Sequence, residues 1–229
     1  MPCGLYGKLP MKRDFISVEA PRNFLSVWEP WLQGGIAGSR IRLGTGWRDV
    51  FLRAPIWRFW LGPDICGYPV IGSFMSSVDG VGRFFPLTAI AHGDKGDMFA
   101  RPPDDPHTEW FSEVEALLLS VLEEGATYDA CLQALAALPV PPRSPAPAPN
   151  DSVRYLYRAS AAPAPSPDDI PAGISTLLSE REGRMYSGAS FWWTIGGEEF
   201  APMVLAADGL PDPNIVTAML NGQFEEAAG

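Results

Sequence analysis

Residues 73–91, with the sequence SFMSSVDGVGRFFPLTAIA, constrain the fold of this chain more than any other stretch. Two runs of strand-forming residues, 68–75 and 83–91, flank a polar connection with two glycines, and this order predicts a hairpin. Apolar residues occupy both alternating positions of each run, so other layers of the protein must cover both faces of these strands. Pro86 cannot donate a hydrogen bond to a neighbouring strand, and it therefore indicates a bulge or an outer position in the sheet.

Composition limits the class of protein. With 229 residues, of which 46% are hydrophobic, the chain can bury a large core, and we expect a single domain over residues 1–229. Its net charge of −10 and its lack of a long basic block argue against binding to nucleic acid or to anionic membranes. The three cysteines are far apart and form no CxxC pair, so we predict reduced thiols and no zinc site. We find no signal peptide or membrane-spanning segment, and we expect a cytoplasmic protein.

The remaining chain alternates between helical and strand-like patterns. Apolar residues at helical spacing predict helices over 21–39, 109–124, 128–138, 175–181 and 212–220. Further strands are predicted over 5–10, 184–195 and 199–206, and as two short strands within 49–61 that are separated by Pro55. Pro30 predicts either a kink in the first helix or a second helix that begins there.

A proline-rich stretch interrupts this pattern at residues 139–171. Its composition favours extended polyproline II structure or disorder. We interpret it as a surface excursion from the single domain, because the residues that follow it are few for an independent core. A linker to a second domain, or a proline-rich ligand of an SH3-type domain, is the alternative.

Charged residues interrupt strongly apolar runs at several points. On the strand that contains Trp57, alternation places Arg58 beside Ile56 and Trp60, and a guanidinium there needs a partner. Asp14 and Asp79 are the predicted partners. We predict that five charged residues gather at one end of the sheet: Lys8, Asp14, Arg58, Asp79 and Arg83.

The sequence contains no recognisable catalytic motif. The glycines before Lys8 lack the spacing of a phosphate-binding loop, and no window matches the G-x-S-x-G motif of serine hydrolases. His92 and His107 have no metal-ligand spacing, and we expect His107 to be exposed in its proline-rich loop. We therefore predict no cofactor, no metal and no enzymatic activity. A small hydrolase or ligand-binding enzyme with an unrecognised site is the alternative.

Several ordered blocks along nearly the whole chain resemble the TagF family, also called ImpM, of type VI secretion. They are Gly4 with 7–10, Asp14 with Phe15, Trp28 with 31–32, 54–59, 77–79 with 82–83, 85–88, and Ser190 with 192–193. The resemblance implies a three-layer α/β/α sandwich, with a central mixed sheet covered by helices on both faces. The proline-rich stretch matches none of these blocks.

The same resemblance implies a function without catalysis. Members of this family are cytoplasmic accessory proteins that restrain assembly or firing of the secretion apparatus after translation, through a component such as its forkhead-associated scaffold protein. No catalytic residues follow from it. We predict stoichiometric binding to a secretion component, with loop 76–82 and Arg83 in the binding surface. The candidate partner-binding or structural residues are Lys8, Asp14, Trp57, Arg58, Ser77, Asp79 and Arg83.

Overall fold

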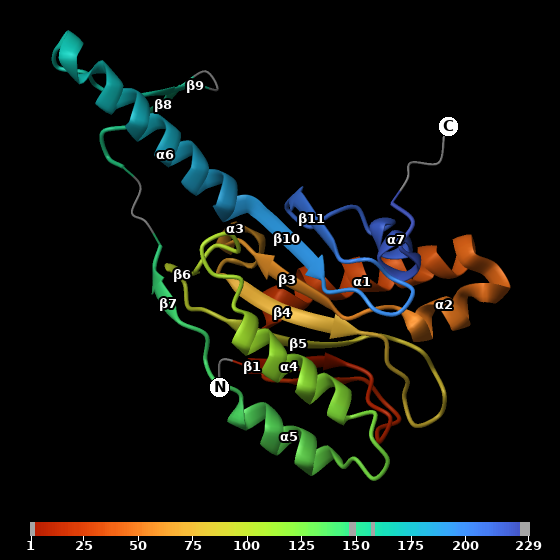
Figure 1. The fold of residues 1–229 in the computed structure, drawn as a ribbon. Helices are drawn as coiled ribbons and strands as arrows, with labels where there is room; N and C mark the ends of the chain where they lie inside the picture. The colour runs from red at the N-terminus through yellow and green to blue at the C-terminus, as the bar shows by residue number, and fades with distance from the viewer. Residues whose placement is uncertain (1–2, 147–149, 157–158, 225–229) are drawn as a thin grey trace.

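A seven-stranded sheet runs through the centre of the protein in the computed structural model, which describes residues 3–146, 150–156 and 159–224 (Figure 1). Its strand order is β11 (Met203–Asp208), β10 (Ala189–Thr194), β3 (Trp57–Leu61), β4 (Val70–Met75), β5 (Leu87–His92), β1 (Cys3–Gly7) and β2 (Ile16–Val18). The strands after residue 183 thus pair into the same sheet as residues 57–92.

The predicted α/β class, with helices on both faces of a central sheet, is confirmed. We expected a mixed sheet, but its strands are antiparallel in all six neighbouring pairs. Connection length explains the direction in four of these pairs. The segments that join β1 to β2, β3 to β4, β4 to β5 and β10 to β11 are all too short for a parallel crossover, which needs about a dozen residues or more. The hairpin predicted around residues 76–86 is therefore present.

One face of the sheet is covered by α1 (Arg22–Leu43), α2 (Trp47–Arg53) and α7 (Ile215–Asn221) (Figure 1). Its core is strongly aromatic. The Trp28 ring lies 4.5 Å from the Phe59 ring and 5.7 Å from the Trp192 ring, and its Nε1 donates to the Thr88 hydroxyl at 3.1 Å. Pro30 lies inside α1 without splitting it, because Trp28 and Leu32 pack on the sheet on either side of the proline.

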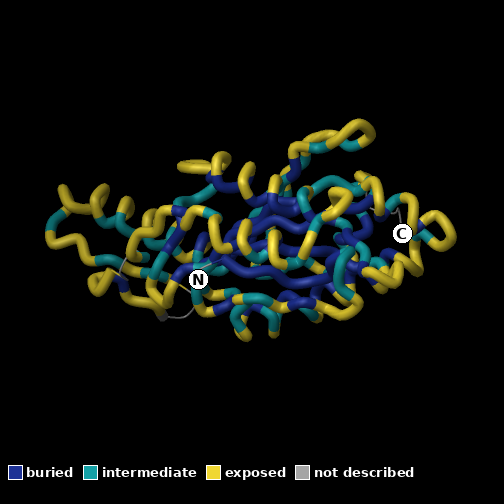
Figure 2. The backbone as a smooth tube through the Cα atoms, turned by 90° about the horizontal axis from the view of Figure 1, so that it is seen from below, coloured by how far each residue is buried: buried dark blue, intermediate teal, exposed yellow. Residues whose placement is uncertain are grey.

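The opposite face is covered by α4 (Thr108–Ser120) and α5 (Tyr128–Ala137). Thr127 caps α5, since its hydroxyl accepts a hydrogen bond from the Ala130 backbone N–H at 3.2 Å. The predicted alternation along β3 is confirmed: Trp57, Phe59 and Leu61 face the aromatic layer, and Trp60 faces α4. Figure 2 shows the result, with buried backbone in the middle and exposed turns outside.

The smaller elements lie around this sandwich. They are η1 (Gly44–Gly46), α3 (Pro63–Cys66), η2 (Pro167–Asp169), and two pairs of short strands, β6 (Asp97–Phe99) with β7 (Arg143–Pro145) and β8 (Arg154–Leu156) with β9 (Ala159–Ala161). The long helix α6 (Ile170–Gly188) projects away from the sheet (Figure 1). The proline-rich stretch supplies β7, β8, β9 and η2, and residues 147–149 and 157–158 within it lie outside the described residues.

Four sequence predictions are wrong in detail. Residues 47–53 form α2 instead of a strand, because Trp47 and Phe51 share one helical face and stack at 4.7 Å. The helix predicted over 175–181 runs to Gly188, so residues 184–188 are helical and do not belong to the predicted strand 184–195, because the interior Gly183 costs only about 1 kcal/mol relative to alanine. Strand β5 begins after Pro86 instead of at Arg83. His107 is buried, with its Nε2 3.1 Å from the Ala100 carbonyl oxygen.

Close packing between α1 and α7 gives a first testable prediction. A methyl group placed on Gly35 would lie 2.3 Å from the Val216 Cγ2 atom and 2.9 Å from the Pro213 carbonyl oxygen. We expect Gly35→Ala to lower the free energy of unfolding by about 1 to 3 kcal/mol, measured by urea denaturation, because the helices must separate. Gly34→Ala is the matched control, since its added methyl group would meet Pro213 at an ordinary 3.5 Å. Equal effects of the two substitutions would contradict this packing.

Candidate partner-binding site

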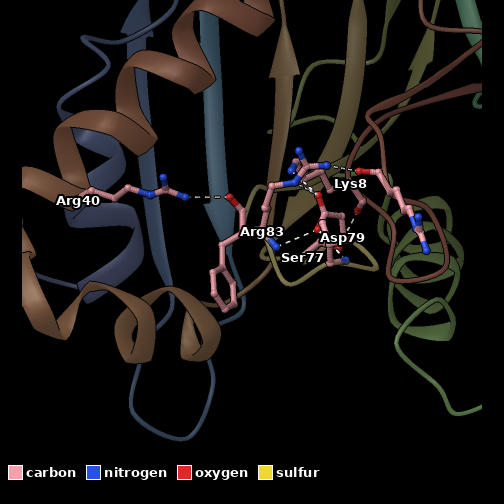
Figure 3. Close-up of polar contacts among 8 residues, drawn as sticks. Lys8, Arg40, Ser77, Asp79 and Arg83 are labelled. Carbon is pink, nitrogen blue, oxygen red and sulfur yellow. Dashed lines mark hydrogen bonds and ion pairs between the residues drawn. The ribbon is translucent and has the colours of Figure 1, made fainter.

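The loop between β4 and β5 is organised around the Asp79 carboxylate. Its Oδ1 accepts hydrogen bonds from the backbone N–H groups of Val81 at 3.1 Å and of Arg83 at 2.8 Å. Its Oδ2 accepts from Lys8 Nζ at 2.6 Å and from Arg83 Nε at 2.7 Å. Figure 3 shows these side chains converging on the carboxylate. With four donors, the side chain fixes the course of the loop.

Lys8 enters this cluster from the end of β1. Its ammonium lies over the Phe15 ring, 5.0 Å from the centroid, and the residue is only 5% exposed. The buried Ser77 hydroxyl donates to the Lys8 carbonyl oxygen at 2.7 Å. Lys8 follows β1 and Ser77 follows β4, so the cluster joins two loops at one end of the sheet.

Electrostatics keep the Asp79 carboxyl ionised. Burial by itself would raise the pKa of Asp79, but hydrogen bonds from Lys8, Arg83 and Val81 outweigh it and hold that pKa well below its usual range. The carboxylate therefore works as a fixed acceptor for the loop, and it is not poised to exchange protons near neutral pH.

Arg83 combines a structural contact with an exposed surface. Its Nε binds Asp79 and its guanidinium also donates to the Arg13 carbonyl oxygen, which ties the loop to the β1–β2 connection. The side chain is nevertheless 57% exposed. Arg83 can thus stabilise the loop and present a cation to a partner.

The structure brings together only part of the predicted cluster. Lys8, Ser77, Asp79 and Arg83 meet as expected, whereas Asp14 lies exposed on the β1–β2 connection. Trp57 lies inside the aromatic layer, where its Nε1 donates to the Met219 carbonyl oxygen at 2.8 Å.

The predicted partner of Arg58 is wrong. Its guanidinium makes a two-point contact with Glu115 of α4, with Nε to Oε1 at 2.5 Å and Nη2 to Oε2 at 3.0 Å. Arg58 also lies over the Phe111 ring, 5.3 Å from the centroid. The cause is that Arg58 faces the α4 layer, away from loop 76–82. Glu115 follows Phe111 by one helical turn on α4, but nothing in the sequence indicates that α4 covers Arg58.

Sequence analysis missed a hollow beside the Asp79 cluster. It has a volume of about 670 Å³ and lies among α1, α2 and the end of loop 76–86. We call it the cationic hollow. Lys8, Arg40, Arg48 and Arg83 supply its charges, and its aromatic rings are Phe15, Trp47, Phe84 and Phe85. The arginines of α1 and α2 gave no signal because nothing in the sequence places them beside loop 76–86.

Comparison with known proteins identifies the family. The model of the TagF N-terminal domain, described as type VI secretion system-associated, matches residues 4–138. The chain belongs to the TagF family. Among solved structures, this TagF-family chain is similar to the crystal structure of PA0076 from Pseudomonas aeruginosa PAO1, with 33% identity and a TM-score of 0.77. That match covers 97% of this chain and 96% of the other. A comparison with curated proteins finds no match.

The part of the chain matched by the TagF family model contains the Asp79 cluster, the Arg58–Glu115 pair and the cationic hollow. All three therefore lie in the region that defines membership of the family. Within the described residues, no helix is long and apolar enough to cross a bilayer, and no group of three or more His, Cys, Asp or Glu side chains is arranged to hold a metal ion.

The three cysteines of this TagF chain are unreactive in character. Burial raises the pKa of Cys3 to about 11 and that of Cys66 to about 12, and it also raises the pKa of Cys131. The thiolate is the nucleophilic form of cysteine, so these buried thiols are suited to packing.

Proposed function

We propose that this chain is a non-enzymatic, cytoplasmic accessory protein that restrains type VI secretion after translation. It does so by stoichiometric binding to a component of the system, such as its forkhead-associated scaffold protein. Membership of the TagF family supports the link to type VI secretion. Restraint by binding and the identity of the partner are the parts that we propose.

The observation that carries this proposal is the state of the Asp79 cluster. Its carboxylate is occupied by four donors, and the pKa of Asp79 is lowered away from the range that acid–base catalysis requires. The donors hold loop 76–83 in one shape while Arg83 stays exposed. A partner would lose little entropy in ordering such a loop, and arginine is a frequent anchor in protein interfaces.

The second prediction concerns Arg83. We expect Arg83→Ala to weaken binding to the purified scaffold protein by up to about 2 kcal/mol in isothermal titration calorimetry, because an interface anchor is lost. Arg42→Ala is the matched control, since Arg42 is an exposed arginine of α1 that does not line the hollow. We expect it to bind as the wild type does.

Thermal unfolding measured on the same samples separates the two roles of Arg83. Weaker binding at a nearly unchanged melting temperature supports an interface role. A lower melting temperature with undiminished binding by the folded protein would show that Arg83 only stabilises the loop. If no purified type VI component binds the wild-type chain, or if the chain turns over a substrate in a hydrolase screen, the proposed function is wrong.

A further inference from the structure

The cationic hollow concentrates positive charge on a protein that is acidic as a whole. The chain carries a net charge of −10, yet four cationic side chains line this one surface. None of the described residues that line the hollow is a carboxylate. Asp79 lies at its side, fully buried, and is already engaged by Lys8 and Arg83. An anionic partner would therefore be attracted to the hollow and repelled by most of the remaining surface.

Arg40 and Arg48 are the cations of the hollow that can still bind a carboxylate. Both are exposed, and among the described residues neither forms an ion pair with a carboxylate. Arg40 donates through Nη2 to the Phe84 carbonyl oxygen at 3.0 Å (Figure 3). Its guanidinium also lies 4.4 Å from the Trp47 ring centroid. These contacts fix its position and leave further N–H groups free to bind a carboxylate in a two-point geometry.

Aromatic rings give the hollow an apolar lining. Phe84 packs edge-on against Trp47 at 6.1 Å and also lies beneath Arg48, whose guanidinium is 5.1 Å from its centroid. Phe15 packs against Phe85 at 4.8 Å, and Phe15 is 48% exposed. Guanidinium groups that lie over aromatic rings, with exposed aromatic surface beside them, suit a ligand that carries both carboxylates and apolar side chains.

We propose that the cationic hollow binds an acidic segment of the partner protein, in which Asp or Glu side chains flank an aromatic or aliphatic residue. This proposal rests on the proposed function and names the chemistry of the partner at that site. The carboxylates pair with Arg40 and Arg48, and the apolar residue packs against Phe15 and Phe84. Because the cations are placed by contacts within the protein, little side-chain entropy is lost when the segment binds.

The test uses the full chain and a fluorescently labelled peptide of sequence Asp-Glu-Phe-Glu-Asp, followed by fluorescence anisotropy. Arg40→Glu, Arg48→Glu and the double variant are compared with Arg42→Glu, which makes the same charge change as Arg40→Glu on α1 but lies outside the hollow. We expect saturable binding that weakens as salt rises. The double variant should bind about tenfold more weakly or worse, whereas Arg42→Glu should stay within about twofold of the wild type. Arg48→Glu is the variant that should disturb the fold least, because the Arg48 side chain makes a ring contact and no hydrogen bond within the described residues. A loss of binding in this variant therefore cannot be attributed to misfolding.

Each alternative outcome overturns the proposal. Absence of saturable binding, or equal weakening by Arg40→Glu and Arg42→Glu, would show that the hollow is not an acidic-peptide site. Preferential binding of a phosphorylated peptide or a single-stranded oligonucleotide would assign it to another ligand class. If the purified secretion component binds the wild type and the double variant equally well, this inference fails while the proposed function stands. If no component binds at all, the proposed function fails.

Discussion

Replacing Asp79 with alanine is expected to lower the melting temperature by roughly 10 °C, because it leaves the buried Lys8 ammonium without a counterion. Two backbone N–H groups of the loop lose their acceptor as well. Differential scanning calorimetry measures the change. Asp14→Ala is the control, because Asp14 is exposed on the β1–β2 connection, and we expect a shift of about 1 °C or less.

The stabilising effect of Asp79 should also depend on pH. In the folded protein the pKa of Asp79 lies below its ordinary value of 3.8. At pH values above 3.8 the ionised carboxylate therefore makes its full contribution to the free energy of unfolding. The contribution is lost as the pH falls, because the unfolded chain takes up the proton first. We expect the difference in melting temperature between the wild type and Asp79→Asn to narrow from about pH 5 to about pH 2. A difference that is constant over this range would contradict the ionised state of Asp79.

Glu115→Ala is expected to lower the free energy of unfolding by about 3 kcal/mol, measured by urea denaturation. The substitution leaves the Arg58 guanidinium, whose side chain is 8% exposed, without its carboxylate. Glu113→Ala is the matched control, since Glu113 lies exposed on the same helix, and we expect a change within about 0.5 kcal/mol.

A double variant separates the cost of an unpaired charge from the value of the pair. Arg58→Met with Glu115→Leu removes both charges and keeps apolar volume, so it should recover much of the stability that Glu115→Ala loses. If the double variant has a lower free energy of unfolding than Glu115→Ala, the ion pair itself stabilises the fold, and the expectation that an unpaired charge causes most of the loss is wrong.

Local patterns predicted the parts of the fold that depend on one stretch of chain. The period of two along Trp57, Arg58 and Phe59 correctly separated the two faces of β3, because side chains of a strand alternate wherever that strand lies in a sheet. The β4–β5 hairpin was predictable for a similar reason, since its turn and both strands are contiguous. The grouping of Lys8, Asp79 and Arg83 followed from polar residues that border apolar runs.

Choices between distant partners were not predictable in this way. Arg58 faces α4, so Glu115 becomes its partner, but no local pattern says which helix covers that face. The cationic hollow depends on α1 and α2 lying beside loop 76–86, which long-range packing decides. Residues 184–188 are helical because α6 continues through Gly183, a choice that local propensity leaves nearly balanced. Folding of residues 1–229 as one cooperative unit stays a prediction.

The most direct test of restraint by binding is secretion itself, measured in a type VI-secreting bacterium that overproduces this chain. We predict that release of type VI effectors into the medium falls while the cellular amounts of the secretion components stay constant, because the chain acts after translation. Overproduction of the Arg40→Glu, Arg48→Glu double variant at the same level should leave effector release nearly unchanged. Undiminished release with the wild-type chain, or a fall that is matched by loss of the secretion components themselves, would contradict the account.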